Sequence, residues 1–117
     1  MKKTKHTTIS PEIIHARDLG LPIVALESTV ITHGLPIPQN MELARDMEAK
    51  VREQGAVPAT VALLDGKIRV GIDDTELEKL ANAKDPVKVS RRDFAKAIVK
   101  KLDGGTTVAG TMLAAEQ

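Results

Sequence analysis

The sequence of 117 residues contains no cysteine, tryptophan or tyrosine and a single phenylalanine. Without cysteine the chain can form neither a disulfide framework nor a thiolate zinc site. The scarcity of aromatic residues leaves the core to Val, Ile, Leu, Ala and Met, and it argues against binding of single-stranded nucleic acid, which uses aromatic stacking. No stretch approaches the roughly 18 consecutive apolar residues of a membrane span, and the basic start lacks the apolar core of a signal peptide.

Charge of one sign is also lacking, because 17 basic residues face 16 acidic ones and the net charge is +1. Proteins that bind nucleic acid usually carry a basic excess. The 42% apolar and 28% charged residues are typical of a soluble globular domain. We therefore expect a soluble, cytoplasmic protein with one domain's worth of chain, and no nucleic-acid or membrane partner.

Helix and strand signals alternate along the chain and predict an α/β fold. Residues 1–9 are polar and are expected to form a flexible arm, whereas 10–117 are expected to form one domain. The continuous apolar run 21–26 predicts a fully buried strand. Asp65-Gly66 lies between two β-rich runs in 57–72 and predicts a hairpin. Further expected elements are a helix starting at Ser10, a helix over 41–54 capped by Asn40, a helix near 74–83 opened by Asp73 and Glu76, a strand over 86–90, a helix starting at Ser90 and stopped by Gly104-Gly105, and a helix-prone end.

Glu27 is the first candidate for chemistry, since it directly follows the apolar strand 21–26 in "ALESTVITHGLPIPQN". A glutamate that points to solvent at a strand end is the commoner case in local sequence. However, ligands of α/β sheets bind beyond the carboxyl ends of the strands. A partly desolvated carboxylate there could serve as a general acid or base. Histidine signals are weaker: His33 precedes a glycine in a loop, and the three histidines show no metal-ligand spacing, so we assign no metal site.

The segment "KVSRRD", residues 88–93, could bind an anion. Lys88 and Ser90 share a face if the segment is a strand, and Arg91 follows at the start of a helix, whose amino end favours anions. Alternatively, Ser90 only caps that helix and the basic side chains are solvated. The segment "GGTTVAGT", 104–111, could cradle a phosphate, but it lacks the spacing of known phosphate-binding loops, and a helix stop followed by a short strand is the better explanation from the pattern alone.

Four stretches in order resemble one family, the pseudouridine-5'-phosphate glycosidases, which are related to indigoidine synthase A. They are "ALESTVITHGLPIPQN", "EQGAVPATVALLDGKIRVG", "KVSRRD" and "GGTTVAGTM". The resemblance implies reversible cleavage of the carbon–carbon glycosidic bond of pseudouridine 5'-phosphate, which gives uracil and ribose 5-phosphate. It also implies an imine with a lysine as covalent intermediate, a divalent metal, typically Mn²⁺, and a homotrimer.

The resemblance assigns roles to individual residues. Glu27 matches the proton donor, Lys88 matches a substrate-binding lysine, and Val108 matches a substrate-binding position that acts through its backbone. To these we add Ser90 and Arg91 as anion contacts from the pattern of "KVSRRD" alone.

The imine-forming lysine and the metal aspartate of the family lie in downstream segments that this sequence does not contain. Gly110 also stands where the family often has a serine. We therefore interpret the chain as the incomplete N-terminal part of a larger α/β/α fold, with a mixed sheet and flanking helices. It is expected to be inactive alone. A non-catalytic sugar-phosphate-binding module and a degenerate fragment that folds poorly remain open.

Overall fold

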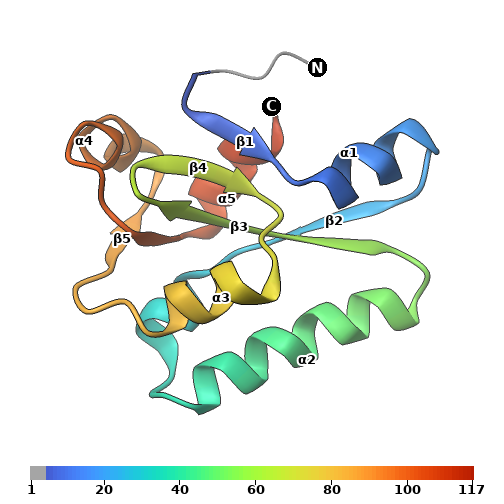
Figure 1. Ribbon diagram of the computed structural model, residues 1–117, viewed down its shortest axis with the longest axis horizontal. Helices are drawn as coiled ribbons and strands as arrows, with labels where there is room; N and C mark the ends of the chain where they lie inside the picture. The colour runs from blue at the N-terminus through green and yellow to red at the C-terminus, as the bar shows by residue number, and fades with distance from the viewer. Residues whose placement is uncertain (1–4) are drawn as a thin grey trace.

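The computed structural model describes residues 5–117 as a mixed sheet with helices on both faces (Figure 1). The strands are β1 (Thr7–Ile9), β2 (Ile23–Leu26), β3 (Val57–Leu64), β4 (Lys67–Val70), β5 (Val87–Val89) and β6 (Gly104–Thr106). The α-helices are α1 (Pro11–Asp18), α2 (Gln39–Glu53), α3 (Asp74–Ala81), α4 (Phe94–Val99) and α5 (Val108–Ala115). A π-helical turn η1 (Val30–Gly34) and a 3₁₀ turn η2 (Arg91–Asp93) complete the fold. The predicted α/β class is confirmed.

Strand β3 is the centre of the sheet. The strand order is β1-β4-β3-β6-β5, and β2 also pairs with β3. The first half of β3 pairs with β2 in parallel, and its second half pairs with β6 in the antiparallel sense. Since β4 occupies the opposite side of β3, strands β2 and β6 lie end to end along the same side. Their carboxyl ends therefore meet.

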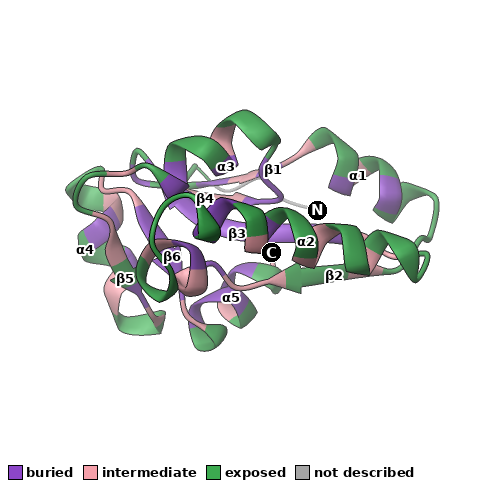
Figure 2. Ribbon diagram, turned by 90° about the horizontal axis from the view of Figure 1, so that it is seen from below, coloured by how far each residue is buried: buried purple, intermediate pink, exposed green. Residues whose placement is uncertain are grey.

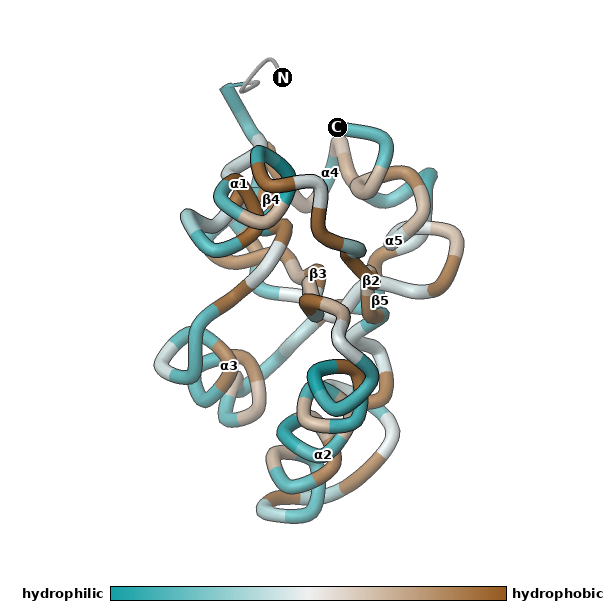
Figure 3. The backbone as a smooth tube through the Cα atoms, turned by 90° about the vertical axis from the view of Figure 1, so that its right-hand side faces the viewer, coloured by the Kyte–Doolittle hydropathy of each residue, from teal (hydrophilic) through white to brown (hydrophobic). Residues whose placement is uncertain are grey.

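Two apolar layers hold the helices against the sheet. Ile31 and Met41 of η1 and α2 pack with Leu77 and Leu80 of α3 on one face. On the other face, α1 and α5 pack with β3 and β4, and α4 packs with β3 and β5. Figure 3 shows β3 between these two helical layers. Alternating β3 side chains pack into both layers, which is why nearly every residue of this strand is apolar and buried.

The strongest local sequence signals formed the expected elements. Asp65 and Gly66 have φ angles of 50° and 72°, as a tight hairpin turn requires, and they join β3 to β4. Asp73 and Glu76 form the predicted capping box of α3. The Ser10 side chain accepts a hydrogen bond from the backbone of Ile13 at the start of α1.

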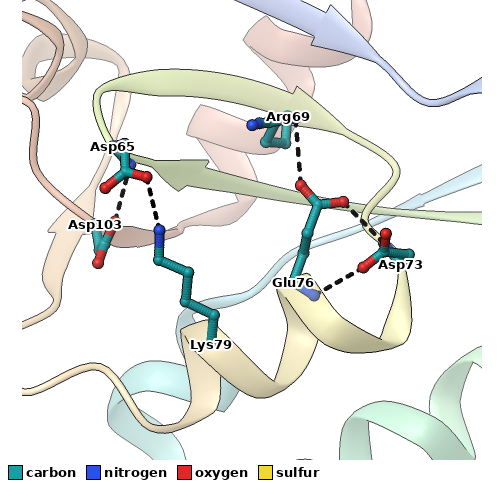
Figure 4. Close-up of polar contacts among 6 residues, drawn as sticks. All are labelled: Asp65, Arg69, Asp73, Glu76, Lys79 and Asp103. Atoms are coloured by element: carbon teal, nitrogen blue, oxygen red, sulfur yellow. Dashed lines mark hydrogen bonds and ion pairs between the residues drawn. The ribbon is translucent and has the colours of Figure 1, made fainter.

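Ion pairs fasten α3 to this hairpin (Figure 4). Lys79 Nζ lies 2.7 Å from Asp65 Oδ2, and this hydrogen bond lowers the pKa of Asp65 and raises the pKa of Lys79. Asp103 Oδ1 accepts a 2.8 Å bond from the backbone of Asp65. Arg69 and Glu76 pair at 3.2 Å. These contacts stabilise the packing of α3, and of the segment just before β6, against the hairpin.

The prediction that 21–26 forms a fully buried strand is wrong. Val24 is 40% exposed and Ala25 is exposed as well, whereas β3 is almost wholly buried (Figure 2). The physical reason is that β2 pairs with β3 and, within residues 5–117, with no other strand.

Other expectations also need correction. Asn40 does not cap α2: it lies inside that helix, and its buried side chain bonds to the carbonyl oxygens of Ile31 and Ala81. Gly104 and Gly105 do not stop a helix, because α4 ends at Val99 and the two glycines belong to β6. Residues 7–9 of the expected flexible arm form β1, which pairs with β4, and residues 1–4 lie outside the described part. None of the described helices is both long and apolar enough to span a bilayer.

Candidate functional site

The carboxyl ends of β2, β5 and β6 converge on one place. The backbone nitrogen of Ser28, just after β2, donates to Thr106 O at the end of β6 over 3.1 Å. The nitrogen of Thr107 donates to Val89 O at the end of β5 over 3.0 Å. These two bonds bring together three segments far apart in sequence. Glu27, Ser90 and Val108 each lie next to a residue that makes one of these bonds.

Buried hydroxyl groups lock this junction. Ser28 Oγ lies 2.5 Å from Val61 O and accepts a 2.8 Å bond from Thr106 N. Thr106 Oγ1 donates to Val61 O at 3.0 Å and lies 2.8 Å from Thr111 Oγ1. Ser28 and Thr106 are fully buried. The network ties the loop that carries Glu27 to the centre of the sheet. The backbone that positions the Glu27 carboxylate is therefore held rigidly.

Glu27 is half-buried at this junction. Its Oε2 accepts a 3.1 Å bond from the backbone of Thr29, and within residues 5–117 no partner contacts its other oxygen. The side-chain hydroxyl of Thr29 is buried and has no hydrogen-bond partner in the same range. One carboxylate oxygen of Glu27 is thus left for a ligand, and the unpaired Thr29 hydroxyl lies buried beside it.

Glu27 and Val108 line one hollow of about 300 Å³. Glu27 is its one ionisable lining group, and the surroundings are mostly apolar. Val108 is 65% exposed at the first turn of α5, a helix capped by the Thr107 side chain, which accepts a 3.1 Å bond from Gly110 N. The lining residues are Ala25, Leu26, Glu27, Met47, Val108, Thr111, Met112 and Ala115.

Lys88 is not among the residues that line this hollow. It borders a second hollow of about 410 Å³ beside α4, together with Lys96 and Lys100. Its strand register nevertheless pairs it with Gly105, and a side chain at Gly105 would collide with Thr32 and with the Ser28 carbonyl. Since paired residues of neighbouring strands point to the same face, the Lys88 side chain leaves β5 on the face against which η1 packs.

The anion site expected from "KVSRRD" is only partly assembled. The Asp93 carboxylate accepts a 2.9 Å bond from the backbone of Ser90, so this amide already has an anionic partner. Arg91 is exposed in the three-residue turn η2. An anion bound there would be more open to solvent than the sequence pattern suggested. Ser90 and Arg91 thus remain predictions that the geometry weakens.

No group of three or more His, Cys, Asp or Glu side chains within residues 5–117 could hold a metal ion. The Nδ1 atom of His33 lies 2.6 Å from the Thr32 hydroxyl on η1.

Sequence reasoning missed the hydroxyl network and the contribution of α2 to the hollow. Ser28 and Thr106 are 78 positions apart, and no local pattern couples them. Met47 of α2 also lines the hollow, and its position in the predicted helix over 41–54 gave no sign of that. The buried Thr106 and Thr111 follow a glycine pair in a motif that was ambiguous between a phosphate loop and a strand.

Comparison with known proteins identifies the family. The family model described as "Indigoidine synthase A like protein" matches residues 12–117. The chain belongs to the indigoidine synthase A-like family. Pseudouridine-5'-phosphate glycosidase 1 of Rhizobium johnstonii is 55% identical over 106 residues, which make up 91% of this chain and 33% of that protein. The pseudouridine-5'-phosphate glycosidase of Staphylococcus aureus is 50% identical over 111 residues, 95% of this chain and 36% of that protein.

Two solved structures share the fold of this chain. The prealnumycin C-glycosynthase AlnA, in complex with ribulose 5-phosphate, matches with a TM-score of 0.83 and 39% identity over 97% of this chain and 36% of its own. The indigoidine synthase A-like protein of Thermotoga maritima matches with a TM-score of 0.79 and 31% identity, covering 97% of this chain and 37% of its own. The chain thus spans about a third of the length of these relatives, and it is a partial fold of the family.

Proposed function

We propose that this chain is the proton-donating part of a pseudouridine-5'-phosphate glycosidase and that Glu27 is the proton donor. The observation that carries the proposal is the hollow shared by Glu27 and Val108, at the point where three strand ends meet. The chain is 50–55% identical to proteins with that activity in their names, which supports the same substrate class.

The chemistry of the bond explains why a carboxylic acid is needed there. The glycosidic bond of pseudouridine joins two carbon atoms, so the departing uracil offers no oxygen to protonate. The uracil carbon that loses the ribose must gain a hydrogen, and a positioned acid supplies it. Thr29 N–H holds one oxygen of Glu27, and the other is available to carry the proton. The apolar lining suits a flat pyrimidine ring.

The chain alone should not turn over. The family resemblance assigns the imine to a downstream lysine and the metal to a downstream aspartate, and neither segment is in this sequence. Loss of a covalent nucleophile typically costs several orders of magnitude in rate. Use of Mn²⁺ and trimeric assembly, which the family resemblance implies, and a cytoplasmic location, which the composition suggests, stay predictions here.

A chimera tests the role of Glu27. Residues 12–117 replace the matched segment of the Rhizobium johnstonii glycosidase, and uracil release from pseudouridine 5'-phosphate is followed. We expect the chimera to be active and Glu27→Gln to lower kcat by about 10²–10⁴-fold, as loss of a general acid does. Glu42→Gln, at an exposed position on α2, is the matched control. A folded chimera with equal activity in both variants would contradict the proposal, as would uracil release by the isolated chain.

A second candidate function is a binding module for a sugar phosphate without catalysis. Its ligand class is supported by AlnA, whose structure was solved in complex with ribulose 5-phosphate. Calorimetric titration of the isolated chain with ribose 5-phosphate separates the candidates. Saturable binding that Lys88→Ala weakens, with no activity in the chimera, would favour the module.

A further inference from the structure

Strand β2 has a free edge that differs from an ordinary surface. It pairs with β3 and with no other strand in the described part of the chain, so one side of its backbone is unpaired. Buried backbone groups need hydrogen-bond partners, and an unpaired strand edge is a template for another strand. The sequence of β2, Ile-Val-Ala-Leu, has the continuous apolar character of a strand buried on both faces.

The apolar hollow described above runs along this edge and joins both faces of the sheet. Ala25 and Leu26 are consecutive in β2, so their side chains point to opposite faces, and both line the hollow. Met47 of α2 lines it from one face and Met112 of α5 from the other. The result is a groove with the strand edge at its floor and a helix on each side.

The relatives show what is available to fill this groove. AlnA and the Thermotoga maritima protein reproduce 97% of this chain with TM-scores of 0.83 and 0.79, yet these matches cover only 36% and 37% of their own chains. The segment therefore has almost the same conformation within a structure about three times as long. Strand β2 is already formed and apolar on both faces, so only a neighbouring segment is missing to bury it.

We propose that the free edge of β2, with the groove between α2 and α5, is the surface that docks the other two-thirds of the family fold, through an extended apolar segment. The inference rests on family membership and not on the proposed reaction. It also explains the position of Glu27 at the end of the groove, because docking would close the hollow around its carboxylate and exclude water.

The test compares each substitution in the isolated chain and in the chimera with the Rhizobium johnstonii glycosidase. Val24 is 40% exposed in the chain and would be covered in the chimera, whereas Val99 on α4 is 81% exposed and lies outside the groove. We expect Val24→Lys to change the Tm of the isolated chain by less than about 2 °C and to lower that of the chimera by at least about 5 °C. Val99→Lys should change neither by more than about 2 °C. Met112→Lys, from the other side of the groove, should behave like Val24→Lys.

Three results would overturn the proposal. The first is an equal effect of Val24→Lys in chain and chimera, which would mean that the edge stays open in the longer fold. The second is a chimera that does not fold even without substitutions. The third is an isolated chain that is a stable dimer by light scattering and that Val24→Lys converts to a monomer, since the occupant would then be a second copy. These measurements follow folding and mass, so they are independent of uracil release.

Discussion

The two strands that flank the candidate site, β2 and β5, both have an open edge but present different chemistry to it. The hollow beside β5 is lined by three lysines and one acidic residue, namely Lys88, Lys96, Lys100 and Asp93, and β5 itself has only three residues. The hollow beside β2 has one ionisable group, Glu27, and is otherwise mostly apolar. Short edge strands with lysines resist pairing with other chains, whereas apolar edges invite it. The difference supports the proposed docking at the β2 edge and gives no such support for the β5 edge.

The junction of β2, β6 and β5 depends on two adjacent glycines, and changing either should have the largest effect. A Cβ at Gly105 would lie 2.7 Å from Ser28 O on the β2 side, and one at Gly104 would lie 2.7 Å from Val87 O on the β5 side. Neither backbone can yield without moving a strand. We expect Gly105→Ala and Gly104→Ala each to lower the free energy of unfolding by about 3 kcal/mol, measured by urea denaturation.

The two glycine variants also separate the two edges. Gly105→Ala should shift the amide NMR signals of residues 27–32 more than those of 87–90, and Gly104→Ala should do the reverse. Identical shift patterns for the two variants would show that the edges respond as one unit. The β2 and β5 edges would then not be structurally independent.

Ser28 should follow in size of effect. Ser28→Ala removes an acceptor from Thr106 N and a partner from Val61 O inside a fully buried network. Val61 O keeps the bond from Thr106 Oγ1, but the buried Thr106 N–H loses its partner, which costs about 2 kcal/mol. The control is Ser10→Ala, which removes a partly buried helix cap and should cost about 1 kcal/mol. If thermal or urea unfolding gave the two variants equal stability, the network would not be what fixes the β2 end.

The parts of the fold that sequence predicted correctly depend on neighbours within a few residues. The Asp65-Gly66 turn and the Asp73–Glu76 capping box are complete signals in themselves. Asn40 also looked like a local cap, yet its amide bonds to Ala81 O, 41 positions away.

The same limit applies to the site. Glu27 could be placed beyond a strand end from the pattern alone, and the structure puts it there. That Val108 shares its hollow while Lys88 lies beside another depends on the order of β2, β6 and β5, which no local pattern encodes. The exposure of β2 was missed because the apolar sequence indicates a strand suited to burial. It does not show that, within residues 5–117, one side of this strand has no neighbour.

The lysines beside β5 can be removed to make the two edges alike. We expect the double variant Lys96→Leu/Lys100→Leu to self-associate, with an apparent mass by light scattering at about 100 µM that rises toward that of a dimer, because apolar side chains would then replace two of the three lysines beside β5. The control Lys50→Leu/Lys84→Leu makes the same change at exposed positions on α2 and after α3. Equal association of both variants would mean that total charge, and not the guarding of this edge, keeps the chain apart.

The smallest expected effect is at the ion pair between α1 and α2, which contributes to stability through charge alone. Arg52 Nη1 lies 2.8 Å from Glu12 Oε2, and both side chains are about half exposed. The hydrogen bond from Arg52 lowers the pKa of Glu12 below its ordinary value of 4.5. A carboxylate with a lowered pKa in the folded state stabilises the protein above its unfolded pKa, and this contribution is lost as the pH falls through the folded pKa.

Glu12→Gln should therefore lower the free energy of unfolding by less than about 1 kcal/mol at pH 7, because solvent screens an exposed pair. The difference from the unsubstituted chain should shrink as the pH falls below about 4.5 and vanish once Glu12 is protonated in the folded state. Urea denaturation of both proteins from pH 7 to pH 3 measures this difference. A Glu12→Gln effect larger than that of Ser28→Ala would place the main restraint on the β2 region in its surface charges and not in its buried hydroxyl network.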